Sequence, residues 1–447
     1  MFSSSSSRRN ITLNNKTITI VPMLQSALAS MYTPSLGGVR VRQKLPQTRV
    51  APAPANNPRV KQQPQPPQPV YHQQPPQDAT AQDTIFVSIP AYRDPEVITT
   101  LEELFKKAKY PQRVIAGVCQ QIDELKDHAF DVRTTTSNVL RRYMDQNIRI
   151  LTLPASEAKG PSYARARIEQ DLFEDEIFFL GIDSHTAFVP GWDVLVIDEL
   201  LKCNSARPML TVYPQDYTRK AATGGAAGAG NKLGGAAPIP TANRTVNTKS
   251  PVCFIKFNSF HPQLGLPQTE RVNFRKPPRQ PQPSLFISAG FVFTLGEVIR
   301  EAPYEELPYL FLGEEIVMAL KYFLTGVDFF SPSKHIVFHL NDRTYRPLFW
   351  ENFYQSSNGR RTTVPEHVRS ERKAIERASQ EYVLALLTGN ATFRFGGGDN
   401  GDGTTRTVDQ FRAYTGLDVV MKTATREALM GLVPGATREE VVCKTGQ

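Results

Sequence analysis

The chain has 447 residues, 40% of them hydrophobic, and a formal net charge of +9. The charge is confined to one region, because residues 1–77 contain nine Lys or Arg and no Asp or Glu, whereas residues 78–447 carry 43 charges of each sign. The body of the protein therefore has no bulk charge to attract DNA or RNA, and no apolar run is long enough to cross a membrane.

Residues 1–83 are predicted to form a basic, disordered arm. Its second part, residues 51–77, consists largely of Pro and Gln, which favours extended polyproline II conformations and cannot build a core. Such a segment serves either as a spacer or as a ligand for an SH3- or WW-like partner. The four cysteines lie far apart with no metal-binding spacing, which is typical of buried thiols in a reducing compartment, so we expect a cytoplasmic protein.

Regular structure is expected from Thr84 onward, where unbroken apolar runs alternate with helical patterns. The predicted strands are residues 84–92, 113–121, 147–153, 176–182 and 208–214. The predicted helices between them are residues 94–108, 132–146, 160–173 and 192–203. This alternation indicates an α/β fold with an open, mostly parallel sheet and helices on both faces. Ligands of such sheets bind beyond the carboxyl ends of the strands.

A Gly-rich stretch, residues 217–250, interrupts the pattern without apolar periodicity. It does not satisfy a phosphate-binding loop, because Asn231 precedes Lys232 and Leu233 stands where Ser or Thr is needed, so we interpret it as a surface loop. Structure is predicted to resume at residues 251–260, 284–302, 313–326 and 335–340. Residues 356–447 are predicted to form a polar, partly helical extension.

The strand 176–182 ends abruptly in Asp183-Ser184-His185. On an extended chain, residues i and i+2 project to the same side, so Asp183 and His185 could hold one cation together. The alternative from these residues alone is an Asp that caps the next turn beside a surface His. His339, at the end of the predicted strand 335–340, is a candidate third ligand.

Other polar residues stand at the ends of predicted elements. Arg93 and Asp94 follow the first strand, where α/β folds bind nucleotides, although a local ion pair with a helix cap would explain them equally well. Glu314 and Glu315 begin a helix, a position that favours acids through the helix dipole alone. Arg165 and Arg167 lie on opposite sides of one helix, so at most one of them can face a shared site.

Three blocks of the sequence, residues 84–121, 158–193 and 303–332, resemble the glycosyltransferase family of Skp1-type hydroxyproline N-acetylglucosaminyltransferases. The resemblance rests on "YRDPE", on "DSH" followed by "FVPGWD", and on "LPYLFLGEEI", in this order. That family is distantly similar to the mucin-type polypeptide GalNAc-transferases. The resemblance implies a GT-A fold over residues 84–355, with residues 217–283 as a variable insertion.

The resemblance also implies roles for individual residues. Asp183, His185 and His339 would bind a divalent ion, Mn²⁺ or Mg²⁺. The catalytic group would comprise Glu314, Glu315 and Asp183. The sugar-nucleotide donor would be contacted by a further group of residues, namely Arg93, Asp94, Arg165, Ser184 and Gly290.

The resemblance implies a metal-dependent transferase that moves a sugar, N-acetylglucosamine, from a UDP-sugar to a hydroxyl of a protein, with retention of configuration. The acceptor side chain would be hydroxyproline, Ser or Thr. Two alternatives stay open: the same fold acting on a glycan or with another nucleotide sugar, and a catalytically inactive module that binds a glycan or partner.

Overall fold

The protein is described by a computed structural model, which divides it into two compact units, Met1–Gln73 and Gln74–Gln447. The structure describes residues 9–13, 16–20, 83–219, 244–352, 365–395 and 405–434. In the first unit, strands β1 (Arg9–Leu13) and β2 (Lys16–Ile20) pair antiparallel. The rest of the predicted arm, including the Pro/Gln segment, lies outside the described residues, as do residues 220–243 of the Gly-rich stretch.

The second unit is built on an eight-stranded sheet in the order β13-β15-β8-β14-β6-β3-β4-β5. Its strands are β3 (Ile85–Tyr92), β4 (Val114–Ile122), β5 (Ile148–Pro154), β6 (Phe178–Ile182), β8 (Pro208–Thr211), β13 (Gln282–Pro283), β14 (Phe291–Leu295) and β15 (Asp328–Ser331). Strands β6, β3, β4 and β5 are parallel neighbours, and β14 runs antiparallel between β6 and β8. The predicted open, mostly parallel α/β sheet is confirmed.

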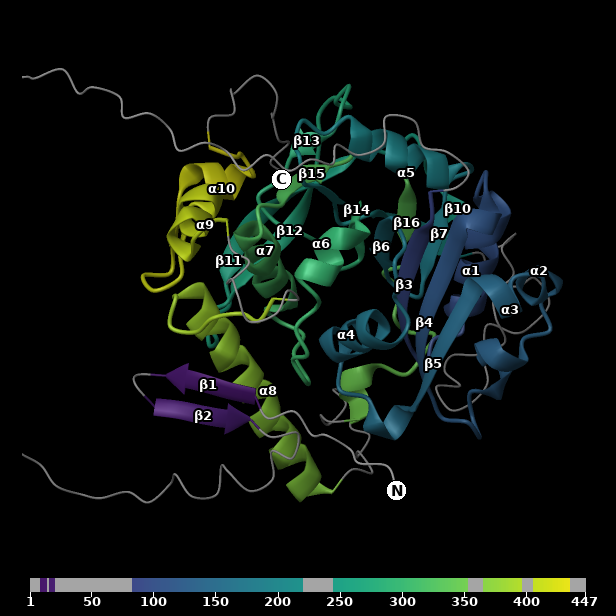
Figure 1. Cartoon of the computed structure of the whole chain (residues 1–447), viewed down its shortest axis with the longest axis horizontal. Helices are drawn as coiled ribbons and strands as arrows, with labels where there is room; N and C mark the ends of the chain where they lie inside the picture. The colour runs from purple at the N-terminus through teal and green to yellow at the C-terminus, as the bar shows by residue number, and fades with distance from the viewer. Residues whose placement is uncertain are drawn as a thin grey trace, which may run out of the picture. The chain divides into compact units, whose positions relative to one another are not determined.

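Helices cover both faces of this sheet (Figure 1). The main ones are α1 (Glu96–Lys107), α4 (Pro161–Asp171), α5 (Trp192–Leu201), α6 (Gly296–Glu301) and α7 (Glu314–Leu324). Crossovers between parallel strands are right-handed. Because α1 leads from β3 to β4 and α4 leads back from β5 to β6, the two helices lie on opposite faces. Helix α5 packs beside α1, where the Trp192 indole donates to the Leu104 carbonyl at 2.9 Å.

The single helix predicted over residues 132–146 is wrong. The structure has a 3₁₀ turn at Val132–Thr134, then α2 (Asn138–Arg141) and α3 (Met144–Asn147). Residues 134–137 are three threonines and a serine, whose hydroxyls compete for backbone partners and disfavour a continuous helix. The Ser137 hydroxyl instead accepts from the Leu140 N–H and starts a new helix. Further 3₁₀ turns lie at Pro111–Arg113, His128–Phe130, Ala155–Glu157 and Phe349–Asn352.

A second, four-stranded sheet lies at the carboxyl end of β6 and has the order β10-β9-β16-β7. It comprises β7 (Thr186–Phe188), β9 (Gln215–Arg219), β10 (Arg244–Val246) and β16 (Val337–His339). A separate pair is formed by β11 (Cys253–Phe260) and β12 (Pro267–Asn273). The sequence patterns did not predict β7, β9 or β10, because strands of three to five residues carry too few positions for periodicity.

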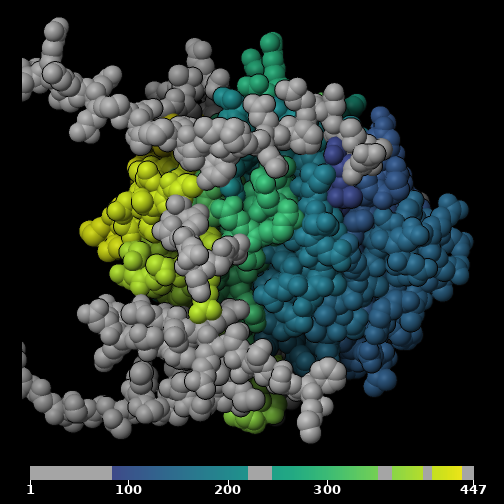
Figure 2. All heavy atoms as spheres, viewed as in Figure 1, coloured from purple at the N-terminus to yellow at the C-terminus, as the bar shows by residue number. Residues whose placement is uncertain are grey.

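The C-terminal elements pack onto the same core. They are α8 (Glu366–Leu387), α9 (Val408–Thr415), β17 (Leu417–Asp418), β18 (Thr423–Ala424) and α10 (Arg426–Met430). Phe411 of α9 packs against Phe323 of α7, with ring centroids 5.4 Å apart. In Figure 2, the yellow C-terminal atoms lie against the green body. Among the described residues, no helix is long and apolar enough to span a membrane.

Candidate active site

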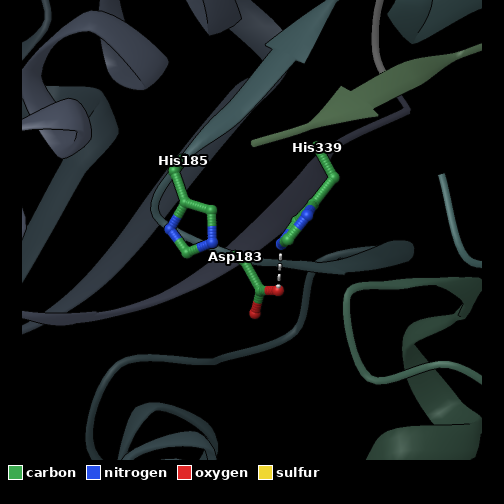
Figure 3. Close-up of side chains that lie close together, drawn as sticks. All are labelled: Asp183, His185 and His339. Atoms are coloured by element: carbon green, nitrogen blue, oxygen red, sulfur yellow. Dashed lines mark hydrogen bonds and ion pairs between the residues drawn. The ribbon is translucent and has the colours of Figure 1, made fainter. Parts of the chain in front are cut away.

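The structure brings three predicted ligands together where β6 ends. Asp183 and His185 follow β6, and His339 ends β16. One potential ligand atom from each residue lies within 4.8 Å of the other two. Nε2 of His339 is 3.1 Å from Oδ2 of Asp183, and the centroids of the two imidazole rings are 4.6 Å apart. Figure 3 shows the three side chains converging from two backbone segments, one with Asp183 and His185 and the other with His339.

Strand pairing explains how His339 reaches a motif 156 residues earlier in the chain. Thr186, directly after His185, begins β7, and β7 pairs antiparallel with β16 so that His339 stands opposite Thr186. The N–H of Leu340 also donates to the His185 carbonyl at 3.2 Å. The register of two three-residue strands therefore sets the distance between the histidines.

The charges around these residues favour the forms that bind cations. Burial alone would raise the pKa of Asp183, but His339, Arg165 and His185 hold this pKa well below its usual range. Burial lowers the pKa of His185, so its imidazole is neutral near pH 7. One ionised carboxylate and two imidazoles form a ligand set that suits Mn²⁺ or a similar divalent ion, so the residues present fit the implied metal.

Arg165 lies between Asp183 and the start of α7. Its Nη2 donates to Oδ1 of Asp183 at 2.7 Å, and its Nε is 3.2 Å from Oε1 of Glu314. Arg165 and Glu314 are 4% and 5% exposed, so both charges depend on each other for compensation. The Tyr304 hydroxyl donates to Glu314 at 2.7 Å. Arg167, by contrast, pairs with Asp171 on the outer side of α4, as the helical spacing predicts.

Glu315 contacts a different set of groups from its neighbour Glu314. One oxygen accepts from the Ala289 N–H at 2.9 Å, and the other accepts from the Tyr213 hydroxyl. Burial raises the pKa of Glu315 to about 7. The next residue after Ala289 is Gly290, where an added Cβ would lie 3.1 Å from Oδ2 of Asp183. Gly290 therefore leaves open the space directly beside the Asp183 carboxylate.

The two predicted donor residues after β3 are both occupied by protein partners. Arg93 has a φ of 46° and pairs with Asp127 through two hydrogen bonds of 2.7 and 2.9 Å. Asp94 is 1% exposed, and its carboxylate contacts His185 and Ser184. Ser184 is 3% exposed and donates to Asp94 at 2.6 Å. Donor contacts by these three residues stay predictions.

Some site residues escaped the sequence reasoning. The Tyr345 hydroxyl and the Arg346 guanidinium contact Asp94 from the segment after His339. Tyr213 and Tyr304 hold the two glutamates. Isolated tyrosines carry no signal in one sequence, although the pair "YR" six residues after His339 lies close enough to a predicted ligand to have been considered.

Comparison with solved structures finds distant likenesses to nucleotide-sugar enzymes. A GalNAc-T7 crystal structure with UDP, GalNAc and Mn²⁺ is 12% identical, with a TM-score of 0.40, and the match covers 68% of this chain and 57% of that one. S. aureus TarS with UDP-GlcNAc is 12% identical, with a TM-score of 0.33 and coverages of 67% and 73%. The mannosyltransferase PcManGT from Pyrobaculum calidifontis, with GDP-Man and Mn²⁺, is 10% identical, with a TM-score of 0.32 and coverages of 69% and 76%.

TM-scores this low carry no weight in the assignment, and this chain spans little more than half of the GalNAc-T7 structure. Comparison with curated proteins finds no match. A family model described as "Glycosyltransferase (GlcNAc)" matches residues 84–141 and 129–421, which together include every site residue named above. The chain therefore belongs to the GlcNAc glycosyltransferase family.

Proposed function

We propose that this protein transfers N-acetylglucosamine from UDP-N-acetylglucosamine to a hydroxyl group of a protein, with a divalent ion held by Asp183, His185 and His339. One observation carries the proposal: a carboxylate and two imidazoles, from segments 156 residues apart, meet at the carboxyl edge of an α/β sheet in a chain of this family. Mn²⁺ suits this mixed oxygen and nitrogen set better than Mg²⁺, which prefers oxygen ligands.

The bound ion would neutralise the charge that develops on the leaving diphosphate. The protein's own residues prepare the position for it. Arg165 fixes the Asp183 carboxylate through Oδ1, which leaves Oδ2 facing His339. Glu314 in turn pairs with Arg165 and accepts from the Tyr304 hydroxyl, so Asp183 is oriented by a buried chain of contacts rather than by solvent.

The sugar is proposed to lie beside Gly290 and Glu315. The missing side chain at Gly290 leaves room next to Asp183, and Glu315 lies within hydrogen-bonding reach of the same loop through Ala289. A carboxyl group with a pKa of about 7 can both donate to and accept from sugar hydroxyls near neutral pH. With retention of configuration, the departing phosphate oxygen would take the proton of the incoming hydroxyl, and no separate base would be needed.

The acceptor is the most specific part of the proposal. The sequence resemblance to Skp1-type enzymes supports a hydroxyproline, and Ser or Thr offers the same chemistry. Three buried free thiols, Cys119, Cys203 and Cys253, fit the reducing cytoplasm in which such an acceptor would be modified.

A donor screen tests the proposed function directly. Purified full-length protein would be incubated with UDP-GlcNAc, UDP-GalNAc, UDP-glucose and GDP-mannose, each with Mn²⁺ or EDTA, and release of the nucleoside diphosphate would be measured. We expect slow, Mn²⁺-dependent hydrolysis of UDP-GlcNAc above that of the others. Metal-dependent binding of UDP without turnover would identify an inactive module, and turnover unaffected by EDTA would contradict the metal assignment.

Acceptors would then be sought by mass spectrometry of proteins modified in the presence of UDP-GlcNAc and Mn²⁺. A mass increase of one N-acetylhexosamine on a hydroxyproline, Ser or Thr supports the protein acceptor. Transfer to free glycans alone would instead favour the glycan-directed alternative.

A further inference from the structure

Asp94 is the most heavily engaged carboxylate near the site. The Glu96 N–H and the Tyr345 hydroxyl donate to its Oδ1, at 3.0 and 2.9 Å. The Ser184 hydroxyl and Nδ1 of His185 contact its Oδ2, at 2.6 and 2.8 Å. We propose that Asp94 is a positioning residue that orients His185 toward the metal, and that it makes no contact with the sugar-nucleotide donor. This inference rests on the proposed metal-dependent function.

The contact with Asp94 decides which nitrogen of His185 is left for the metal. A carboxylate beside Nδ1 accepts its proton and fixes the neutral tautomer in which the Nε2 lone pair is free. In Figure 3, one His185 nitrogen faces away from Asp183, and the other points toward Asp183 and His339. The ring is 7% exposed, so the orientation does not depend on solvent.

The hydrogen-bonding capacity of Asp94 argues against a donor contact. A carboxylate offers about four lone-pair positions, and four hydrogen bonds from the protein already occupy them. The side chain is fully buried, and Nε of Arg346 lies 3.3 Å from Oδ2 to compensate its charge. No acceptor position is left for a ribose hydroxyl or a base N–H.

Asp94 also contacts the two chain segments that carry the candidate histidines. Ser184 and His185 belong to the segment after β6, whereas Tyr345 and Arg346 belong to the segment that follows His339. The same carboxylate therefore contacts both segments that supply ligands. Arg346 further donates to the Tyr92 carbonyl at 3.3 Å, which fastens the later segment to the end of β3.

Asp94→Asn tests the role with little change in shape. Asparagine has one acceptor oxygen where aspartate has two, so its NH₂ group must face either the Glu96 and Tyr345 donors or Ser184 and His185. The hydrogen bond with His185 is therefore weakened or lost. We expect Mn²⁺ binding to the full-length protein without nucleotide, measured by electron paramagnetic resonance, to weaken about 10- to 100-fold. At saturating Mn²⁺, the KM for UDP-GlcNAc should stay within about twofold of wild type, because no donor contact is removed.

The control is Glu199→Gln in α5, which alters a buried carboxylate outside the triad that accepts from the N–H and hydroxyl of Ser333. It should leave Mn²⁺ affinity unchanged. Unchanged Mn²⁺ affinity in Asp94→Asn, or a raised KM with normal Mn²⁺ affinity, would overturn the proposal. If wild type itself shows no Mn²⁺ binding that depends on Asp183, then the proposed function fails instead, so the two failures are distinguishable.

A second measurement uses the wild-type protein and so does not depend on the folding of the Asp94 variant. Nitrogen NMR of metal-free wild type, labelled at histidine and assigned with His185→Gln, reports the tautomer directly. We expect the His185 proton on Nδ1 and a free Nε2. A proton on Nε2 would refute the positioning role, whatever the behaviour of the variant.

Discussion

Two aspartates ten residues apart, Asp183 and Asp193, have opposite surroundings. Asp193 is 0% exposed, and its oxygens accept from the N–H groups of Lys109 and Tyr110 and from Arg113, at 2.7, 3.0 and 3.1 Å. The Asp183 side chain is 28% exposed, and its two side-chain partners are Arg165 and His339, a histidine that can bind metal itself. The Asp193 carboxylate is fully enclosed by hydrogen-bond donors of the protein. The Asp183 carboxylate is oriented by protein contacts but is accessible on one side.

This difference separates structural from chemical acids better than burial or motif alone. Asp183 follows the buried strand β6 and Asp193 is the second residue of α5, and both contact an arginine. The two residues differ in the other partners of their carboxylates. Asp193 is surrounded by protein donors, whereas Asp183 faces a histidine and the space beside Gly290. The predictions below test whether groups held by the fold act on stability while groups left open at the site act on activity.

The largest effect is expected for Asp183→Ala. Loss of a metal ligand should lower UDP-sugar turnover by about 1000-fold and abolish Mn²⁺-dependent UDP binding, because the leaving diphosphate would lose its electrostatic stabilisation. Stability should change less than in Asp193 variants, since Arg165 keeps its contact with Glu314. Turnover and UDP binding would be compared with Asp171→Ala on the outside of α4. Full activity in Asp183→Ala would remove the metal assignment.

Asp193→Ala should lower stability and leave metal binding unchanged, the opposite of Asp183→Ala. Removing one partner of a buried ion pair typically costs about 3 to 5 kcal/mol, so we expect a marked fall in the free energy of unfolding in urea. Molecules that remain folded should keep normal Mn²⁺ affinity. The control is Asp198→Ala on the same helix, whose side chain is 51% exposed and pairs with Lys202, and which should cost less than about 1 kcal/mol. A loss of Mn²⁺ affinity in folded Asp193→Ala would break the comparison.

Glu169 predicts a dependence of stability on pH. Burial raises the pKa of Glu169 to about 8, while the Tyr304 N–H donates to it at 2.6 Å. Because the folded pKa exceeds the unfolded value, the protonated group contributes stability that is fully present below about pH 4.5 and is lost as the pH rises through about 8. The loss between pH 5 and 8 is on the order of 3 kcal/mol.

Glu169→Gln should remove much of this pH dependence, because glutamine cannot ionise and its oxygen can still accept from Tyr304. Urea unfolding at several pH values measures it. Glu297→Gln, at an exposed position of α6, should keep the wild-type profile. Parallel curves for wild type and Glu169→Gln would contradict the raised pKa.

The smallest effect is expected for Gly290→Ala. The new methyl group would lie 3.1 Å from Oδ2 of Asp183, so the carboxylate must shift by a few tenths of an ångström. We expect about a tenfold loss of turnover and weaker Mn²⁺ binding, with little change in stability. Gly181→Ala is the matched control, because a Cβ there meets its nearest atom at 3.6 Å. Equal effects of the two substitutions would exclude a special role for the space beside Asp183.

The sequence was a good guide to the sheet and a partial guide to the site. Continuous apolar runs such as residues 84–92 predict buried strands because both faces of a parallel strand are covered, and β3 to β6 confirm this. The spacing of Asp183 and His185 allowed a shared cation site, because both lie on one extended segment, but it allowed a turn-capping Asp beside a surface His as well. The run of Thr and Ser at residues 134–137 interrupts the helix predicted over residues 132–146.

The arrangement around Asp94 could not be read from spacing. A position after the first strand suggested a donor contact, yet its partners come from residues 184–185 and 345–346. Local sequence shows that such a carboxylate stands at a strand end. It does not show whether the carboxylate faces solvent or other side chains, since those side chains arrive from distant segments.

The sequence by itself therefore predicted the α/β class, the parallel strands β3 to β6 and the candidate ligand pair Asp183 and His185, because these depend on periodicity and on neighbours along the chain. Only the tertiary structure decided that His339 lies beside this pair and that the carboxylates of Asp94 and Asp193 are buried among protein donors. The physical reason is strand register: β7 has only three residues and no readable periodicity, yet its pairing with β16 sets the distance from His339 to the segment that carries Asp183 and His185.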